Sequence, residues 1–330
     1  MYGQAGFNWM VHSMEKENGL TNTVCFAIGQ IPWICRQIEY GHSVANYGPK
    51  HVNLVAVSPR DRFNQLNDIF LQDLSSRPLG KGDFTQADNF LSLTLSVDNQ
   101  IIHPARCYGL WQRYHGGRWG SEMDVPYFYR DFDENSAENI RKLDDDYSTI
   151  RNALRTHFPD EPFTYMLSYL ELEKLNHNSE HDGDILASLR DSSQLWAIKT
   201  PTLVGREGGG SRILNTQNRF FTDDIPYGIL IAKAIAEKLN VEVPFISEVV
   251  TWAETVRGEK FLINGKINKQ FCLKDKYTCG IPESYGITSF KEIYVQSQHL
   301  KEGNTDATTR VSCVSCSFFW KKETPATLQS

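Results

Sequence analysis

The stretch SAENIRKLDDDYSTIRNALRTHF, residues 136–158, decides the character of the larger part of the chain. It begins with Ser136 and carries Glu138 in what would be the first turn, a pattern typical of a helix N-terminal cap. Apolar side chains then recur every three or four residues, at Ile140, Leu143, Tyr147, Ile150, Leu154 and Phe158. This spacing predicts a long amphipathic helix with one face in a core.

The residues that follow repeat this helical spacing. Pro226 and Pro244 each lie where a first helical turn would begin, a favoured position for proline. A glycine-rich segment, residues 204–219, reads as a connector. We therefore predict a mainly helical second half, with helices within 163–175, 182–196, 223–239 and 243–258.

The first hundred residues indicate an α/β segment. A buried strand within 23–35 is broken by Gly29 and Pro32. Two valine-rich runs flank the turn at 48–50, which predicts a hairpin. The remaining expected elements are a helix that begins near residue 60 and ends before Pro78, with Phe63, Leu66, Ile69, Phe70 and Leu74 on one face, and a strand over 91–97, where apolar residues alternate with Ser and Thr.

Composition excludes several classes of protein. The 330 residues include 18 Phe, 14 Tyr and 7 Trp, and 40% are hydrophobic, as expected of a packed globular protein with room for two domains. The net charge of -6 offers no excess of cations for nucleic acid. No apolar run reaches the roughly 18 residues of a membrane span, and the N-terminal sequence lacks a secretory-signal pattern. We expect neither a nucleic-acid partner nor a membrane span.

The seven cysteines are odd in number and scattered, which favours reduced thiols and a cytoplasmic location. The alternative is a zinc site, in which the CxxC of Cys313 and Cys316 would combine with Cys272 and Cys279. The second pair is seven residues apart instead of three, so we expect no metal.

One segment with candidate chemistry is NQIIHPARCYGLW, residues 99–111. Asn99 and His103 are four residues apart, which places them on one helical face. Pro104 restricts His103 to an extended or helix-start conformation. A histidine at such a strand-to-helix boundary can present its imidazole to a cleft and exchange protons near neutral pH. The alternative is a half-buried histidine that hydrogen-bonds the backbone.

A second segment is NRFFTDDIPYG, residues 218–228. Asp223 and Asp224 precede the helix opened by Pro226, where the helix dipole favours acidic residues, so a capping role alone would explain them. Arg219 would equally suit a surface ion pair. An arginine able to grip a carboxylate, near an aspartate able to orient a histidine, is nevertheless what an acid–base site requires.

Together with GQAGFNW (3–9), IPWICRQIEYG (31–41), YGPK (47–50) and CGIPESYGITSFKEI (279–293), these segments resemble the octopine/nopaline, or opine, dehydrogenases. The resemblance implies a Rossmann-like dinucleotide-binding domain followed by a helical domain of the 6-phosphogluconate-dehydrogenase C-terminal type. We expect a partial dinucleotide-binding domain at 1–98, the helical substrate domain at 99–300 and an irregular tail at 301–330.

The resemblance also implies an activity and a site. Opine dehydrogenases use NAD or NADP to reduce the imine formed between a 2-oxo acid, usually pyruvate, and an amino acid. The catalytic histidine of the family falls on His103 and its acidic partner on Asp224. Arg219 and Asn99 fall on substrate-binding positions, and Cys35 falls where the amino-acid pocket is lined.

One expected motif is missing. No G-x-G-x-x-G turn follows any predicted strand, and such a turn holds the pyrophosphate of the cofactor. The first half of the cofactor domain is therefore expected to be absent, and cofactor-binding residues are not identified. The alternatives are a non-catalytic relative that binds an amino acid or a partner, and a distant 3-hydroxyacyl- or 6-phosphogluconate-type dehydrogenase. The His-Pro and DDIPYG motifs argue against the last.

Overall fold

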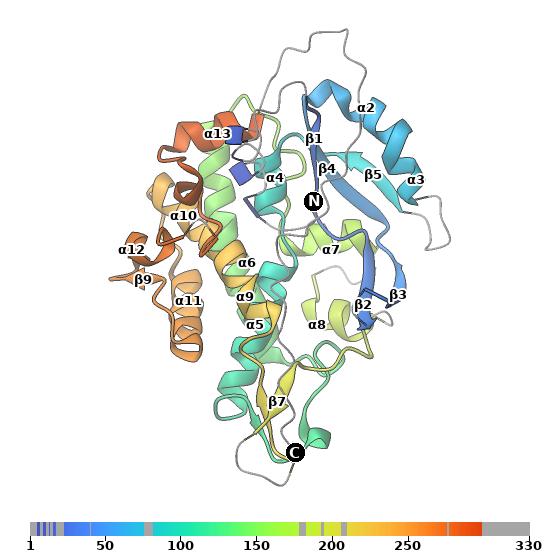
Figure 1. Cartoon of the computed structure of the whole chain (residues 1–330), viewed down its shortest axis with the longest axis vertical. Helices are drawn as coiled ribbons and strands as arrows, with labels where there is room; N and C mark the ends of the chain where they lie inside the picture. The colour runs from blue at the N-terminus through green and yellow to red at the C-terminus, as the bar shows by residue number, and fades with distance from the viewer. Residues whose placement is uncertain are drawn as a thin grey trace.

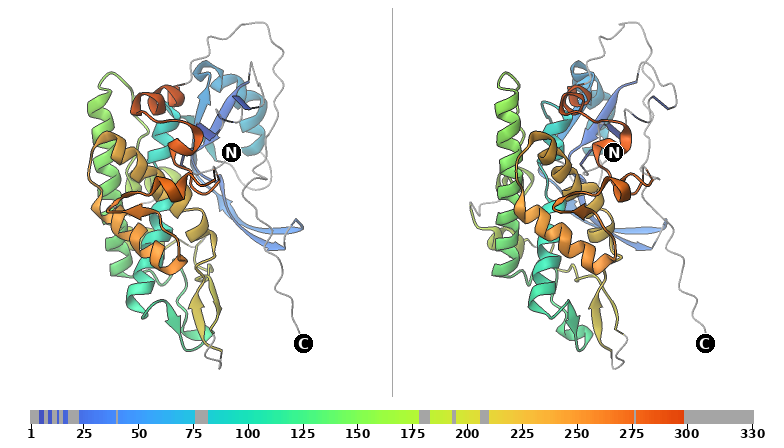
Figure 2. Two further views of the ribbon diagram at one scale, coloured as in Figure 1. Left: turned by 60° about the vertical axis from the view of Figure 1, so that its left-hand side comes forward. Right: turned by 90° about the vertical axis from the view of Figure 1, so that its left-hand side faces the viewer.

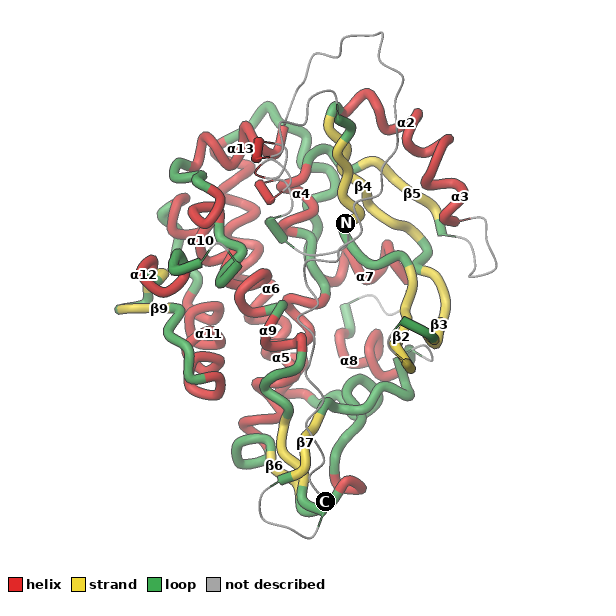
Figure 3. The backbone as a smooth tube through the Cα atoms, viewed as in Figure 1, coloured by secondary structure: helices red, strands yellow, loops and turns green. Residues whose placement is uncertain are grey.

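The computed structural model describes residues 5–6, 9–10, 13, 16–17, 23–39, 41–75, 82–177, 183–192, 195–205, 210–275 and 277–298. A small sheet with short helices forms one part, and a larger body of helices lies beside it (Figures 1 and 3). The predicted order, α/β first and helical second, is confirmed. None of the helices in the described ranges is both long enough and apolar enough to cross a membrane. The CxxC cysteines, Cys313 and Cys316, lie outside the described residues.

The α/β part precedes residue 90. Its strands are β1 (Cys25–Ile28), β2 (Trp33–Glu39), β3 (Ser43–Pro49), β4 (Val52–Ser58) and β5 (Asp83–Gln86). Between β4 and β5 the chain forms η1 (Arg60–Arg62), α2 (Phe63–Leu66), the π-turn η2 (Asn67–Leu71) and α3 (Gln72–Ser75).

The helical part contains α4 (Phe90–Leu95), α5 (Asn99–Arg113), α6 (Glu134–His157), α7 (Tyr169–His177), α8 (Ile185–Arg190), α9 (Arg219–Thr222), the π-turn η4 (Ile225–Ile229), α10 (Leu230–Leu239), α11 (Pro244–Arg257), α12 (Lys269–Cys272) and α13 (Phe290–Gln298). Short elements complete it: η3 (Glu122–Asp124), η5 (Pro282–Tyr285), β6 (Arg118–Trp119), β7 (Thr202–Val204), β8 (Arg212–Leu214), β9 (Leu262–Ile263) and β10 (Lys266–Ile267).

Strand β4 is the centre of the main sheet. It pairs antiparallel with β1 and parallel with β5, so η1 to α3 form the crossover of a β–α–β unit. Leu54 and Ala56 belong to an apolar cluster with residues of α4 and α7, whereas Val55 and Val57 cluster with Leu66 and other residues of the crossover. The alternation of β4 therefore joins the sheet to the helical part on one face and to the crossover helices on the other.

The predicted hairpin at 48–50 is wrong. Strand β3 pairs with β2, whereas β4 pairs with β1 and β5. The turn of the true hairpin contains Gly41, whose φ of 70° is accessible to glycine, and the backbone N–H of His42 bonds the carbonyl of Glu39 at 3.1 Å. The hairpin β2–β3 extends away from the rest of the molecule (Figure 2).

The predicted strand at 91–97 is also wrong, because its residues form α4. Asn89 caps this helix by accepting a hydrogen bond from the backbone N–H of Ser92 at 2.8 Å. All six residues of α4 are buried, including Ser92 and Thr94. Since no face of α4 is exposed, the alternation of apolar and hydroxyl residues does not mark a strand with one face in water.

The predicted amphipathic helices are present with shifted ends. Helix α6 is capped by Asp133 instead of Ser136, and the carboxylate of Asp133 accepts the backbone N–H of Ser136 at 2.8 Å. In the crossover, Leu66 and Leu71 are buried but Ile69 is 51% exposed. The π-turn η2 changes the residues per turn there, so the predicted apolar face does not hold at Ile69.

Candidate active site

The structure brings His103 and Asp224 together, although 121 residues separate them. His103 lies on the second turn of α5, and Nδ1 of its imidazole is 2.8 Å from Oδ2 of Asp224. Asp224 stands at the start of η4 but gives no side-chain cap to that turn within the described contacts. Both side chains are fully buried. The carboxylate therefore serves the histidine and not the helix end.

The position of His103 within α5 corrects a prediction. The histidine was expected at a strand-to-helix boundary, but α4 precedes it and α5 begins at Asn99. Pro104 lies inside the helix, where its missing N–H would ordinarily be unfavourable. Every residue from 100 to 110 is buried, and this packing holds the helix together across the proline. His103 is also completely buried, in contrast to the half-buried alternative.

Aromatic side chains enclose the imidazole. The ring of Phe220 stacks on it, with centroids 3.7 Å apart and planes 24° apart, and Phe128 meets it edge-on at 5.7 Å. The hydroxyl oxygen of Tyr129 lies 3.0 Å from Nε2. Tyr129 was not predicted, because its segment carries no recognisable motif and reaches His103 only through the fold.

The two ring nitrogens therefore have different partners. A carboxylate beside Nδ1 favours a proton on that nitrogen, since a carboxylate only accepts hydrogen bonds. Nε2 of the neutral ring then accepts a hydrogen bond from Tyr129. In this tautomer Nε2 is the nitrogen that gains and loses a proton, and Asp224 stabilises the charged imidazolium.

Asn99 lies on the same helix as His103, and Arg219 lies on α9, just before Asp224. Arg219 is the first residue of α9, which Asn218 caps through the backbone N–H of Phe220 at 3.2 Å. Its guanidinium carbon lies 5.5 Å from the centre of the Phe220 ring, the ring that stacks on His103. Asn99 begins α5, one turn before His103. Both residues are partly exposed.

Cys35 lies in the α/β part, whereas Asn99, His103, Arg219 and Asp224 lie in the helical part. It is half-buried in β2, where its partner across the hairpin is Asn46 of β3. Its contribution to an amino-acid pocket stays a prediction.

A buried ion pair fixes the start of the helix that carries His103. Nζ of Lys50 lies 2.8 Å from Oδ2 of Asp98 and donates to Oε1 of Gln30 at 2.8 Å. Asp98 also accepts the backbone N–H of Asn99, the first residue of α5. Burial by itself would raise the pKa of Asp98, but Lys50 holds that pKa below its ordinary value. The α/β part thus anchors the start of α5, the helix that carries His103.

Glu173 of α7 lies near this ion pair. The charge of Lys50 favours ionised Glu173, but it does not outweigh the effects of burial and of Asp98. Burial, and then the negative charge of Asp98, raise the pKa of Glu173 from 4.5 to about 7. The nearby His177 does not supply a cation, because burial and Lys50 lower its pKa to about 4. At neutral pH the Glu173 carboxyl is therefore only partly ionised.

Replacing Glu173 with glutamine should stabilise the protein above pH 7. The unfolded state loses the proton near pH 4.5 and the folded state near pH 7, so wild-type stability falls across that interval. Since one pH unit corresponds to about 1.4 kcal/mol, the variant should gain on the order of 3 kcal/mol above pH 7 and almost nothing below pH 4.5. Urea unfolding at several pH values measures this.

The control is Glu138→Gln on the exposed face of α6, where the side chain pairs with Arg141. Its free energy of unfolding should change by less than about 0.5 kcal/mol at every pH. A Glu173→Gln advantage that is the same at pH 4.5 and pH 8 would contradict a raised pKa.

The described residues do not form a metal site: no group of three or more His, Cys, Asp or Glu side chains is placed to hold an ion among them. Cys272 and Cys279 are both fully buried. A hydrogen bond with Cys272, and then burial, raise the pKa of the Cys279 thiol. The Cys279 thiol is therefore protonated at neutral pH and packs in the core.

A dinucleotide would need a phosphate-binding turn between a strand and a helix. Among the described residues, β1 leads through Gly29 into β2 without an intervening helix, and β4 leads through Pro59 into η1 without a glycine. Neither of these two junctions is therefore a glycine-containing strand-to-helix turn.

Comparison with known proteins shows which family the chain resembles. The family described as NAD/NADP octopine/nopaline dehydrogenase, alpha-helical domain, matches residues 86–257, slightly more than half of the chain. The chain is 24% identical over 292 residues to an opine dehydrogenase of Haliotis discus hannai, covering 88% of this chain and 69% of that protein. It is 22% identical over 302 residues to a tauropine dehydrogenase of Arabella iricolor, covering 88% and 71%.

The fold agrees with a solved structure of octopine dehydrogenase with NADH and pyruvate. The TM-score is 0.71 at 20% sequence identity, over 91% of this chain and 71% of that one. The predicted fold class, a Rossmann-like α/β part followed by a mainly helical domain, is confirmed. The matched region, residues 86–257, contains α5, α9 and η4. It therefore includes His103, Arg219 and Asp224. The chain belongs to the NAD/NADP octopine/nopaline dehydrogenase family.

Proposed function

We propose that this protein is an opine-dehydrogenase-type oxidoreductase, which joins a 2-oxo acid such as pyruvate to the amino group of an amino acid with NADH or NADPH. The observation that carries the proposal is the buried contact between His103 and Asp224. A histidine held by a carboxylate is suited to move protons near neutral pH, and forming and reducing an imine requires such transfers at oxygen and nitrogen. Membership of the family supports the same reaction.

The residues of this chain are assigned the following roles. Asp224 holds Nδ1 of His103 and stabilises the imidazolium, and His103 is the acid–base group. Arg219 binds a substrate carboxylate, because a guanidinium can grip both carboxylate oxygens. Asn99 positions the substrate carbonyl, and Cys35 lines the amino-acid pocket. Holding the two substrates together in this way supplies much of the rate acceleration in a condensation.

The cofactor, when bound, supplies the hydride that reduces the C=N bond. The steps assigned to the described residues are the proton transfers and the binding of substrate. We assign residues 1–98 to the dinucleotide-binding part and 99–300 to the substrate domain, and the expected tail at 301–330 lies outside the described residues.

The 330-residue chain should oxidise NADH or NADPH when pyruvate and an amino acid are both present, and not with either one alone. A panel of arginine, alanine, glycine, β-alanine and taurine, followed by absorbance at the nicotinamide band, tests this. Product analysis by mass spectrometry should find the amino acid joined to the keto-acid carbon through nitrogen.

A chain that binds neither cofactor by calorimetry and consumes none with any pair would contradict the proposal. Such a result would favour a relative that binds an amino acid or a partner without catalysis. Calorimetry with pyruvate and with each amino acid alone then identifies what the helical part recognises.

A further inference from the structure

We infer that Tyr129 is the proton relay between His103 and the substrate, a role that rests on the proposed function. In this arrangement Asp224, His103 and Tyr129 form one hydrogen-bonded chain, and the hydroxyl of Tyr129 is the group that meets the reacting oxygen.

The contacts of His103 carry the argument. Asp224 lies 2.8 Å from Nδ1 and the Tyr129 hydroxyl 3.0 Å from Nε2, so both ring nitrogens are engaged by the chain itself. Phe220 covers one face of the ring. His103 and Asp224 have no exposed surface, whereas Tyr129 retains 4%. A proton that leaves Nε2 along this path passes through the Tyr129 hydroxyl.

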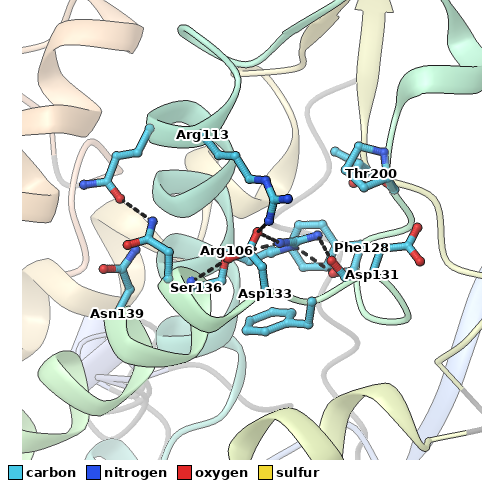
Figure 4. Close-up of polar contacts among 12 residues, drawn as sticks. Arg106, Arg113, Phe128, Asp131, Asp133, Ser136, Asn139 and Thr200 are labelled. Atoms are coloured by element: carbon cyan, nitrogen blue, oxygen red, sulfur yellow. Dashed lines mark hydrogen bonds and ion pairs between the residues drawn. The ribbon is translucent and has the colours of Figure 1, made fainter.

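Tyr129 is held in place by the helix that carries His103. Arg106, one turn after His103 on α5, donates to three backbone carbonyls of the segment 127–131. The bond from Nε reaches Phe128 at 3.0 Å, and one from Nη2 reaches Asp131 at 2.8 Å. Figure 4 shows Arg106 between Phe128, Asp131 and Asp133. These bonds fix the backbone on both sides of Tyr129, so the hydroxyl is positioned before substrate arrives.

The transfer balances in the dehydration step. The C–O bond of the carbinolamine breaks, the nitrogen lone pair forms the C=N bond, and the oxygen leaves as water. That oxygen takes the hydroxyl proton of Tyr129, while the Tyr129 oxygen takes the proton from Nε2 of the His103 imidazolium. One positive charge moves from the imidazolium to the iminium nitrogen, and no oxidant or reductant is needed.

The test compares Tyr129→Phe with Tyr108→Phe. Tyr108 also lies on α5, but its hydroxyl bonds Glu248 at 2.8 Å and its ring packs on Trp111 and Trp252. Both variants lose one hydrogen-bonded hydroxyl and keep the aromatic ring. We expect Tyr129→Phe to lower kcat about 100-fold with little change in KM. Tyr108→Phe should keep the kcat of the wild type.

A second readout does not depend on turnover. In protein labelled with ¹⁵N-histidine, Tyr129→Phe should shift the Nε2 resonance of His103 and leave the Nδ1–H resonance, which reports Asp224, in place. Tyr108→Phe should move neither resonance.

Each outcome of the two measurements supports or overturns the role of Tyr129 as a proton relay. A lowered kcat together with a shifted Nε2 resonance supports it. An unchanged Nε2 resonance overturns it, because the hydrogen bond is then absent in solution. A shifted resonance with wild-type kcat also overturns it, since Tyr129 then only fills space beside His103. Absence of turnover in the wild type would overturn the proposed function, and the relay with it, and the wild-type assay shows this before any variant is made.

Discussion

Asp224→Asn should lower kcat by about 10²- to 10⁴-fold while the protein stays folded. Oδ2 of Asp224 lies 2.8 Å from Nδ1 of His103, and Oδ1 has no hydrogen-bond partner among the described residues. The asparagine amide has the same shape as the carboxylate. Since the amide opens no cavity and can still hydrogen-bond Nδ1, the protein should remain folded.

The loss of activity follows from the tautomer of His103. An asparagine can turn its NH₂ group toward Nδ1, and Nδ1 then accepts a hydrogen bond instead of donating one. The proton moves to Nε2, which faces Tyr129 and can no longer act as a base. The imidazolium also loses its counter-charge. His103→Ala should likewise abolish most turnover, but it leaves a space beneath Phe220, so Asp224→Asn is the cleaner test.

Asp223→Asn is the matched control. Asp223 is the neighbouring carboxylate, hydrogen-bonded to Thr222 at 3.1 Å, and burial and then Asp224 raise its pKa to about 6. Its substitution should keep kcat close to wild type. Steady-state rates and urea unfolding of both variants measure the two effects. Equal kcat values for Asp224→Asn and the wild type would remove Asp224 from the acid–base site.

Local sequence patterns predicted the elements that have one buried and one exposed face. Helix α6 has such faces, and its three-to-four spacing was sufficient. Helix α4 has none, because all of its residues are buried, and its sequence was mistaken for a strand. The pairing of β2 with β3 depends on the turn at Gly41, whose signal was weaker than the Gly-Pro at 48–49.

Local sequence patterns were also insufficient to assemble the candidate site. Asn99 and His103 are four residues apart, and helical spacing alone relates them. His103 and Asp224 are 121 residues apart, so no periodicity relates them, and the resemblance to a family paired them. Tyr129 was missed, although it touches His103, because neither spacing nor motif marks it. Arg106 was within the quoted NQIIHPARCYGLW segment, but its burial among backbone carbonyls becomes visible only in three dimensions.

Arg106→Leu should destabilise the protein by about 3 to 5 kcal/mol. Its side chain is fully buried, and Nη1 lies 2.9 Å from Oδ2 of Asp133. The leucine would leave that carboxylate partly buried with a weaker partner, and the carbonyls of Phe128 and Asp131 without their donor. The carbonyl of Phe128 is buried, so the loss of its hydrogen bond adds to the cost. Urea unfolding at neutral pH measures the change.

Arg113→Leu is the control, because Arg113 contacts the same Asp133 oxygen at 3.4 Å from a side chain that is 57% exposed. Water already solvates that pair, so its loss should cost less than about 1 kcal/mol. If Arg106→Leu is too unstable to purify, Arg106→Leu/Asp133→Asn removes the unpaired charge and keeps an oxygen to cap α6, so part of the stability should return. Equal losses for Arg106→Leu and Arg113→Leu would show that burial of the first pair has no energetic consequence. A large loss confined to Arg106 means that the bonds which position Tyr129 beside His103 also hold the helical part together.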